Sequence, residues 1–120
     1  MIRVNINIDL NIQGITQKAE RAREKGQFAL DQQILKDSNY FIPKDTGNLE
    51  ASSLLATQFG TGEVVWNTPY ARKLYYNPQY NFSKDSNPNA QGLWFETAKA
   101  IHAHDWTRIV QQIYDEEFRR

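Results

Sequence analysis

The sequence predicts an α+β fold: a small antiparallel sheet packed by a long N-terminal helix and a long C-terminal helix, with a short helix after a hairpin. Three observations carry this prediction. They are an alternating apolar pattern at the N-terminus, a helical period directly after it, and a second helical period near the C-terminus. With 120 residues, of which 40% are hydrophobic, the chain fits one domain, residues 1–120, with a modest core.

The N-terminal strand is predicted over residues 2–12. Apolar and polar residues alternate strictly there, and the apolar set is Ile2, Val4, Ile6, Ile8, Leu10 and Ile12. Such alternation is typical of a strand with one buried face. A strand of this length must pair with a neighbour, either in the domain's own sheet or in another subunit.

A long helix is predicted from about Ile15 to Ser38, because apolar residues recur there at steps of three and four. Its inner face is built from unusually small residues: Ala19, Ala22, Gly26 and Ala29. A glycine inside a helix costs about 1 kcal/mol relative to alanine. Because small residues let another backbone approach closely, we expect tight packing against Gly26.

The middle of the chain is predicted to hold a helical turn at 47–53 and strands at 54–59 and 63–67. Gly60-Thr61-Gly62 joins these strands as a hairpin. Thr68 and Pro69 are the residue types of a helix N-cap and first position, so a short helix is predicted to begin there and run through Tyr76. Residues 77–91 form a long loop without periodicity, which we expect to be functional or mobile.

The C-terminal helix is predicted over residues 93–118, where apolar residues again keep a helical period. A break near His104-Asp105 stays open as an alternative, because Asp105 can cap a second segment.

Composition excludes several classes of function. The chain has 14 basic and 14 acidic residues, whereas nucleic-acid binders usually show a basic excess. It has no cysteine, which excludes disulfides, thiolate metal sites and cysteine nucleophiles. Neither a signal peptide nor an apolar stretch of membrane-spanning length is visible, so a soluble protein with no membrane partner is expected.

The sequence carries no pattern typical of catalysis. His102 and His104 fall in a helical segment, where residues two apart point in different directions, so a metal site is disfavoured. No GxSxG, Walker or dinucleotide-binding pattern occurs. We expect no enzyme, no cofactor, and neither catalytic nor metal residues. A small hydrolase or nuclease whose carboxylates converge only in the fold stays open as the alternative.

An aromatic cluster is the most distinctive local feature. It comprises Trp66, Tyr70, Tyr75, Tyr76, Tyr80 and Phe82, with Arg72 and Lys73 among them. Three interpretations are open: a hydrophobic core with tyrosine hydroxyls at the surface, a protein interface, and a stacking surface for nucleic acid. Zero net charge counts against the last.

Three sequence patches carry a family resemblance. They are Pro43-Lys44-Asp45-Thr46-Gly47-Asn48-Leu49, then Val65 to Arg72 running into Tyr75-Tyr76, and finally Asn87-Pro88-Asn89-Ala90 with Leu93-Trp94-Phe95-Glu96. In this order and spacing, the chain resembles the minor capsid proteins of siphophages and prophages of Gram-positive bacteria. That group is similar to the phage tail-completion, or head-tail joining, proteins.

The resemblance implies a structural protein of the virion neck, made in the bacterial cytoplasm. The implied partners are other copies in a ring, the head-closure connector and the tail terminator, with DNA contact at most incidental in the channel. The residues implied as family motif and assembly interface are Pro43, Asp45, Thr46, Gly47, Leu49, Trp66, Pro69, Tyr70, Arg72, Tyr75, Tyr76 and Trp94.

Physical chemistry suggests a scaffold role for several of these residues. Asp45 or Thr46 is expected to cap the turn, and Gly47 to permit a close approach. Arg72 is expected to pair with an acidic group or lie on an aromatic face. Trp94 and Phe95 are expected to begin the last helix inside the core. The sequence does not separate core from interface among them.

Overall fold

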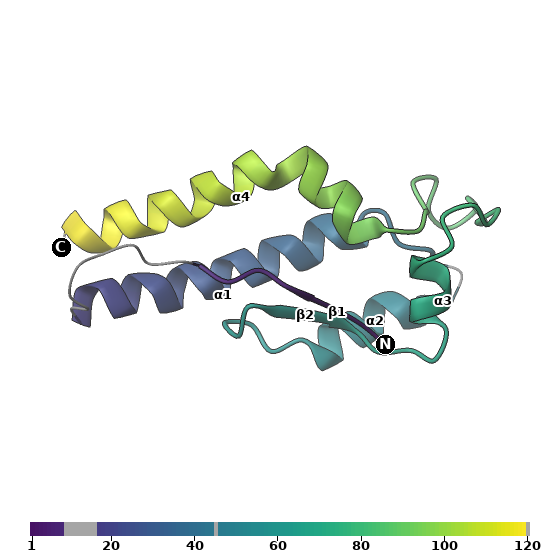
Figure 1. The fold of residues 1–120 in the computed structure, drawn as a ribbon, viewed down its shortest axis with the longest axis horizontal. Coiled ribbons are helices and arrows are strands. Elements are labelled where there is room, and N and C mark those ends of the chain that lie inside the picture. Colours follow the sequence, from purple (N-terminus) through teal and green to yellow (C-terminus); the bar gives the residue numbers. More distant parts are fainter. Residues whose placement is uncertain (9–16, 45, 120) are drawn as a thin grey trace.

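The computed structural model describes residues 1–8, 17–44 and 46–119 of the chain. In chain order the elements are β1 (Ile2–Asn5), α1 (Gln17–Asn39), α2 (Asn48–Ala56), β2 (Glu63–Trp66), α3 (Ala71–Tyr75) and α4 (Trp94–Arg119). The long helices α1 and α4 lie side by side, and residues 6–8, which follow β1, cross the face of α1 (Figure 1). The α+β class is confirmed, and the molecule is elongated, with extents of 50 × 24 × 19 Å.

In the described part of the chain the sheet has two antiparallel strands. Ile2 lies opposite Trp66, and Val4 lies opposite Val64. These alternate side chains face the helices, as the apolar alternation predicted. The predicted strand over 2–12 is too long, because β1 ends at Asn5, and its part beyond Ile8 lies outside the described residues.

The strand ends early because β2 has no residues left to pair with. Ile6 still donates its N–H to the Gly62 carbonyl at 2.9 Å. The side chain of Gln27 on α1 then replaces a strand: its Nε2 donates to the Ile6 carbonyl at 2.8 Å, and its Oε1 accepts from the Ile8 N–H at 3.0 Å. Residues 6–8 are therefore held beside α1 by a side chain.

The predicted hairpin around Gly60-Thr61-Gly62 is wrong. Residues 54–56 belong to α2, so the helical turn predicted at 47–53 is longer than expected. Residues 57–59, which lead into the glycines, form no strand. The short apolar run at Leu54-Leu55 suits either a strand or a helix, and here the helix prevails. The partner of β2 is β1, which lies far earlier in the sequence, at Ile2–Asn5.

A buried carboxylate holds the glycine turn against α1. Asp31 is 1% exposed, and its Oδ2 accepts the N–H groups of Gly60 at 2.7 Å and Gly62 at 3.0 Å. Its Oδ1 accepts from Gln27 Nε2 at 2.8 Å. Because a carboxylate offers several acceptor sites, Asp31 holds the glycine turn directly and residues 6–8 through Gln27.

The expected tight packing at Gly26 is confirmed, and the atoms nearest to this glycine belong to side chains. A Cβ on Gly26 would lie 3.1 Å from Ile8 Cδ1 and 3.4 Å from Tyr114 Cε1. Ala19 and Ala22 on the same face are fully buried. Gly26 therefore lets Ile8 and the helix α4 both pack closely against α1.

An ion-pair cluster joins the far ends of the long helices. Glu117 on α4 is buried and bonds Arg21 Nε at 3.1 Å and Lys25 Nζ at 2.8 Å, both on α1. Helix α4 runs without a break at His104-Asp105. Among the described residues, no helix is both long and apolar enough to cross a membrane.

Two details of the region after β2 complete the fold. The expected cap at Thr68 is wrong: α3 begins after Tyr70, and the buried Thr68 hydroxyl has no partner among the described residues. Residues 77–91 contain no helix or strand, as predicted. They are anchored near Pro43, because Asn87 Nδ2 donates to the Ile42 carbonyl at 2.8 Å and the Gln91 N–H donates to the Phe41 carbonyl at 2.9 Å.

Candidate assembly surface

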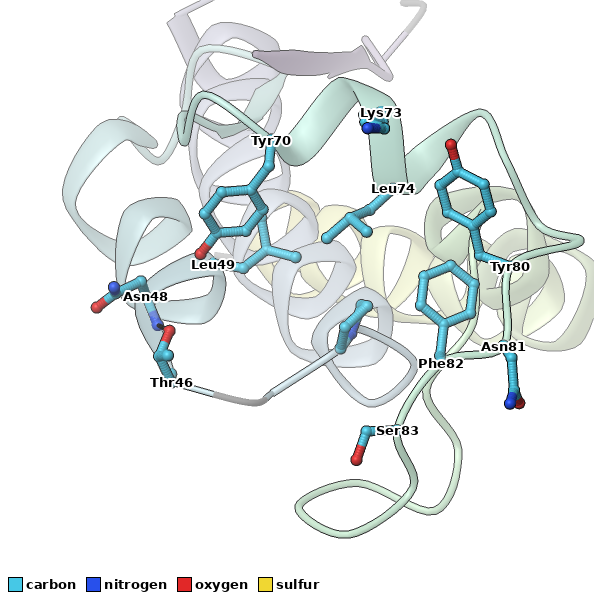
Figure 2. A pocket seen from close by; sticks show the side chains of 12 residues that line it. Thr46, Asn48, Leu49, Tyr70, Lys73, Leu74, Tyr80, Asn81, Phe82 and Ser83 are labelled. Atoms are coloured by element: carbon cyan, nitrogen blue, oxygen red, sulfur yellow. Dashed lines mark hydrogen bonds between the residues drawn. The ribbon is translucent and has the colours of Figure 1, made fainter.

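The first two sequence patches meet at a surface groove of about 760 Å³, called here the motif groove (Figure 2). One wall is the segment from Pro43 to Leu49, and the opposite wall is residues 80–83. Tyr70 and Leu74 of the α3 region lie between them. Lys73 is the one charged side chain among the described residues that line the groove.

The wall at 43–49 depends on the start of α2. Gly47 is the N-cap residue of this helix, with φ at +77°, in the left-handed region that favours glycine. The Asn48 N–H donates to Thr46 Oγ1 at 3.3 Å, but Gly47 occupies the N-cap position, so the expected cap at Thr46 is wrong. The expected close approach at Gly47 is wrong, because a Cβ there would meet nothing within 4 Å. Asp45 lies outside the described residues.

A column of aromatic rings connects the core to the surface beside this groove. The Trp66 and Trp94 ring centroids are 5.8 Å apart, and those of Trp94 and Tyr75 are 4.7 Å apart. Tyr75 then contacts Tyr76 at 5.1 Å, and the guanidinium of Arg72 lies 5.3 Å from the centre of the Tyr76 ring. The expectation that Arg72 would lie on an aromatic face is confirmed.

The inner end of the column is fixed by hydrogen bonds. Trp66 Nε1 donates to Asn39 Oδ1 at 2.8 Å, and Asn39 Nδ2 donates to Ser53 Oγ at 3.0 Å. These contacts link β2, α1 and α2. The Tyr75 hydroxyl donates to the carboxylate of Glu96 on α4. The base of the column is therefore held by contacts from β2, α1, α2 and α4.

The aromatic cluster divides between core and surface. Trp66 and Tyr75 are buried, and so is Trp94, which begins α4 inside the core with Phe95 as expected. Tyr76 is 56% exposed, and Tyr70 and Tyr80 are 39% exposed. The outer residues Pro69, Arg72 and Tyr76 line a shallow hollow next to the motif groove. The core interpretation is thus right for the inner rings alone.

The decisive comparison is with known protein families. The family described as "Minor capsid protein" matches residues 4–113, almost the whole chain. This chain belongs to the phage minor capsid protein family. No curated protein and no solved structure gave a match.

Membership assigns this minor capsid protein a structural role in the phage virion, in contact with other virion proteins. A structural family is consistent with a protein that is not an enzyme. The side chains of His102 and Asp105 approach to 3.4 Å on the surface of α4. In the described ranges, no three His, Cys, Asp or Glu side chains gather into a group that could hold a metal ion.

Sequence analysis of the minor capsid protein missed a second exposed apolar surface. Leu54 and Leu55 at the end of α2 are 58% and 88% exposed, and Ile101 on α4 is 58% exposed. Leu54 and Ile101 line another groove of about 760 Å³, called here the α2 groove, on the other side of the 43–50 segment. The signal was the Leu-Leu pair itself, but the strand predicted over 54–59 gave no indication that both side chains lie exposed at the end of a helix.

Proposed function

We propose that this minor capsid protein completes the neck of the virion and joins the head to the tail. In this role residues 1–120 act as a single domain. Copies form a ring between the head-closure connector and the tail terminator, and contact with DNA in the channel is incidental at most. Family membership supports a place in the virion, and the surfaces described above support adhesion as the mechanism.

The observation that carries the proposal is the outward end of the aromatic column. Tyrosine and arginine are favoured anchors of protein interfaces, because they combine a large apolar area with polar tips. Tyr76 and Arg72 are exposed, whereas the residues that hold them are buried. The motif residues therefore build a buried base for side chains that are exposed at the surface.

A ring subunit needs two different contact surfaces, one for each neighbour. The motif groove and the α2 groove flank the 43–50 segment. Tyr70 lines the first groove, Leu54 and Ile101 line the second, and all three side chains are exposed. Large apolar side chains gathered on one part of a small protein mark an interaction site. The two grooves fit the two sides of such a contact.

The test is electron microscopy of particles from the phage or induced prophage with this gene deleted. We expect DNA-filled heads and finished tails that fail to join, and rescue when the protein is supplied. Normal virions, or heads that never package DNA, would contradict the proposal.

A second arm of the test compares exposed aromatic residues at opposite ends of the molecule. The double variant Tyr70→Ala and Tyr76→Ala should fail to rescue joining. The control Phe118→Ala removes a ring that is 44% exposed at the distant end of α4 (Figure 1), and it should rescue joining normally. Equal rescue by both variants would remove the motif groove from the interface.

A further inference from the structure

One edge of the sheet is open. In an antiparallel pair, successive residues point their backbone groups alternately toward the partner strand and away from it. The N–H of Ile6 donates to the Gly62 carbonyl, so the backbone N–H and C=O groups of the even-numbered residues of β1 point toward β2. The backbone N–H and C=O groups of Arg3, Asn5 and Asn7 therefore point away. In the described ranges these groups have no hydrogen-bond partner, and all three residues are exposed.

The opposite edge of the sheet is closed by a side chain. Val65 lies opposite Arg3, so its backbone groups point to the outer edge of β2. There Thr57 Oγ1 accepts from the Val65 N–H at 3.0 Å and donates to the Val65 carbonyl at 3.4 Å. A strand cannot add at this position without displacing Thr57. Folded proteins usually protect their edge strands, and here β2 is protected while β1 is not.

An apolar groove continues from the open edge. Its volume is about 390 Å³, and Ile6 and Ile8 line one side while Trp106, Val110 and Tyr114 of α4 line the other. Leu30 of α1 also lines it, and Lys99 is the one charged residue among its described lining. The helical layer has room for one more strand.

We propose that β1 accepts a third strand, donated by a different protein of the virion. This strand pairs its backbone with Arg3, Asn5 and Asn7. Its inward side chains, every second residue, are apolar and fill the groove beside α4. An acidic residue on the strand meets Lys99 at the rim. The proposal rests on membership of the virion and is independent of the position in the neck.

A second copy of this chain does not fit the open edge. In a second copy, residues 6–8 of the strand are tied to that copy's own α1 through Gln27, whereas the groove beside the open edge is already lined by α4. The outer edge of β2 is closed by Thr57, and the described part of the chain contains no strand outside the sheet. The occupant is therefore an extended arm without a helical layer of its own, from another chain.

Hydrogen exchange tests the pairing directly, with the protein in its natural setting. Amide exchange is measured for the free protein and for the protein within purified virions. We expect the amides of Arg3, Asn5 and Asn7 to exchange at least roughly tenfold more slowly in the virion, the factor that one added hydrogen bond provides. The amides of Val4 and Ile6 are already paired and should change less. Unchanged exchange at Arg3, Asn5 and Asn7 would overturn the proposal.

Substitutions supply an independent test. Asn5→Pro removes an outward N–H and no bond to β2, and proline is tolerated in edge strands. The control Asn5→Thr keeps the N–H. We expect both variants to fold, with equal circular dichroism, and the proline variant to enter virions about tenfold less than the control. Equal incorporation would count against strand addition.

A variant on α4 keeps the proposal testable if the proline disturbs folding. Thr107 is exposed and lines the groove, so Thr107→Trp fills the space. Arg108→Trp places the same ring next to it but outside the groove lining, and serves as the control. Loss of incorporation with Thr107→Trp alone supports the proposal, and equal incorporation overturns it. Slowed exchange in virions that carry the protein away from the neck would refute the neck role and leave strand addition standing.

Discussion

Replacing Asp31 with alanine should destabilise the protein more than any other single loss of a carboxylate. The change removes the acceptor for Gly60 N–H, Gly62 N–H and Gln27 Nε2. The site is 1% exposed, so water does not readily replace the carboxylate. Each buried donor left without a partner costs about 1–3 kcal/mol, and part of the carboxylate's own burial cost is recovered. We expect a net loss of about 3–5 kcal/mol in the free energy of unfolding.

Asp31→Asn separates charge from geometry. Its amide oxygen can keep both glycine bonds, but its NH₂ group then faces Gln27 Nε2, which is also a donor. Rotating the Gln27 amide does not help, because it would place an NH₂ group against the Ile8 N–H. The loss should therefore fall between the wild type and alanine, at about 1–3 kcal/mol.

Urea unfolding followed by circular dichroism measures both losses. The exposed carboxylate Asp115, which bonds Gln111 on the surface of α4, provides the control: Asp115→Ala should stay within about 0.5 kcal/mol of the wild type. In thermal unfolding Asp31→Ala should lower Tm by roughly 10–20 °C. An Asp31→Ala protein as stable as the Asp115→Ala control would refute the role given to this carboxylate.

Three further predictions follow from local geometry. Gly62→Ala should cost about 2–3 kcal/mol by urea unfolding, because Gly62 has a φ of +81° and a Cβ there would lie 3.3 Å from the backbone carbonyl oxygen of Ile6. Gly47→Ala, at a φ of +77° with open space around it, should cost about 1–2 kcal/mol. Glu117→Ala should cost about 1–2 kcal/mol at low salt and less at high salt; no salt dependence would contradict an ionic role. Burial raises the pKa of Tyr114 above 10.0, so the unfolded state loses this proton first and the free energy of unfolding should fall as pH rises past that value. Tyr114→Phe should remove the share of this decrease that comes from the hydroxyl, and a variant with the same pH profile as the wild type would argue against it.

Long periodic segments were predictable from the sequence because their burial pattern repeats over many residues. Helices α1 and α4 lie within a few residues of their predicted bounds. The first residues of the alternating segment form β1 as expected. The region at 54–59 was not predictable, since a short apolar pair fits helix and strand equally, and the strand that pairs with β2 comes from the other end of the sequence.

The candidate surface was predictable in place but not in detail. Adjacent tyrosines illustrate the limit: Tyr75 is 1% exposed and Tyr76 is 56% exposed. A helix as short as α3 shows too little periodicity to tell which of the two faces the core. Asp31 could not be recognised either, because the glycine N–H groups that require it lie about thirty residues away.

The pairing of β1 with β2 has a consequence for how the chain is made. A ribosome adds about 5–20 residues per second, so Ile2–Asn5 waits several seconds before Glu63–Trp66 emerges. The core then waits for Trp94 and Trp106 of α4, which are made later still. During that interval Ile2–Asn5 has no partner strand, and its apolar side chains are exposed to chaperones. The core therefore closes only after α4 has emerged from the ribosome, around residues that were made well before it.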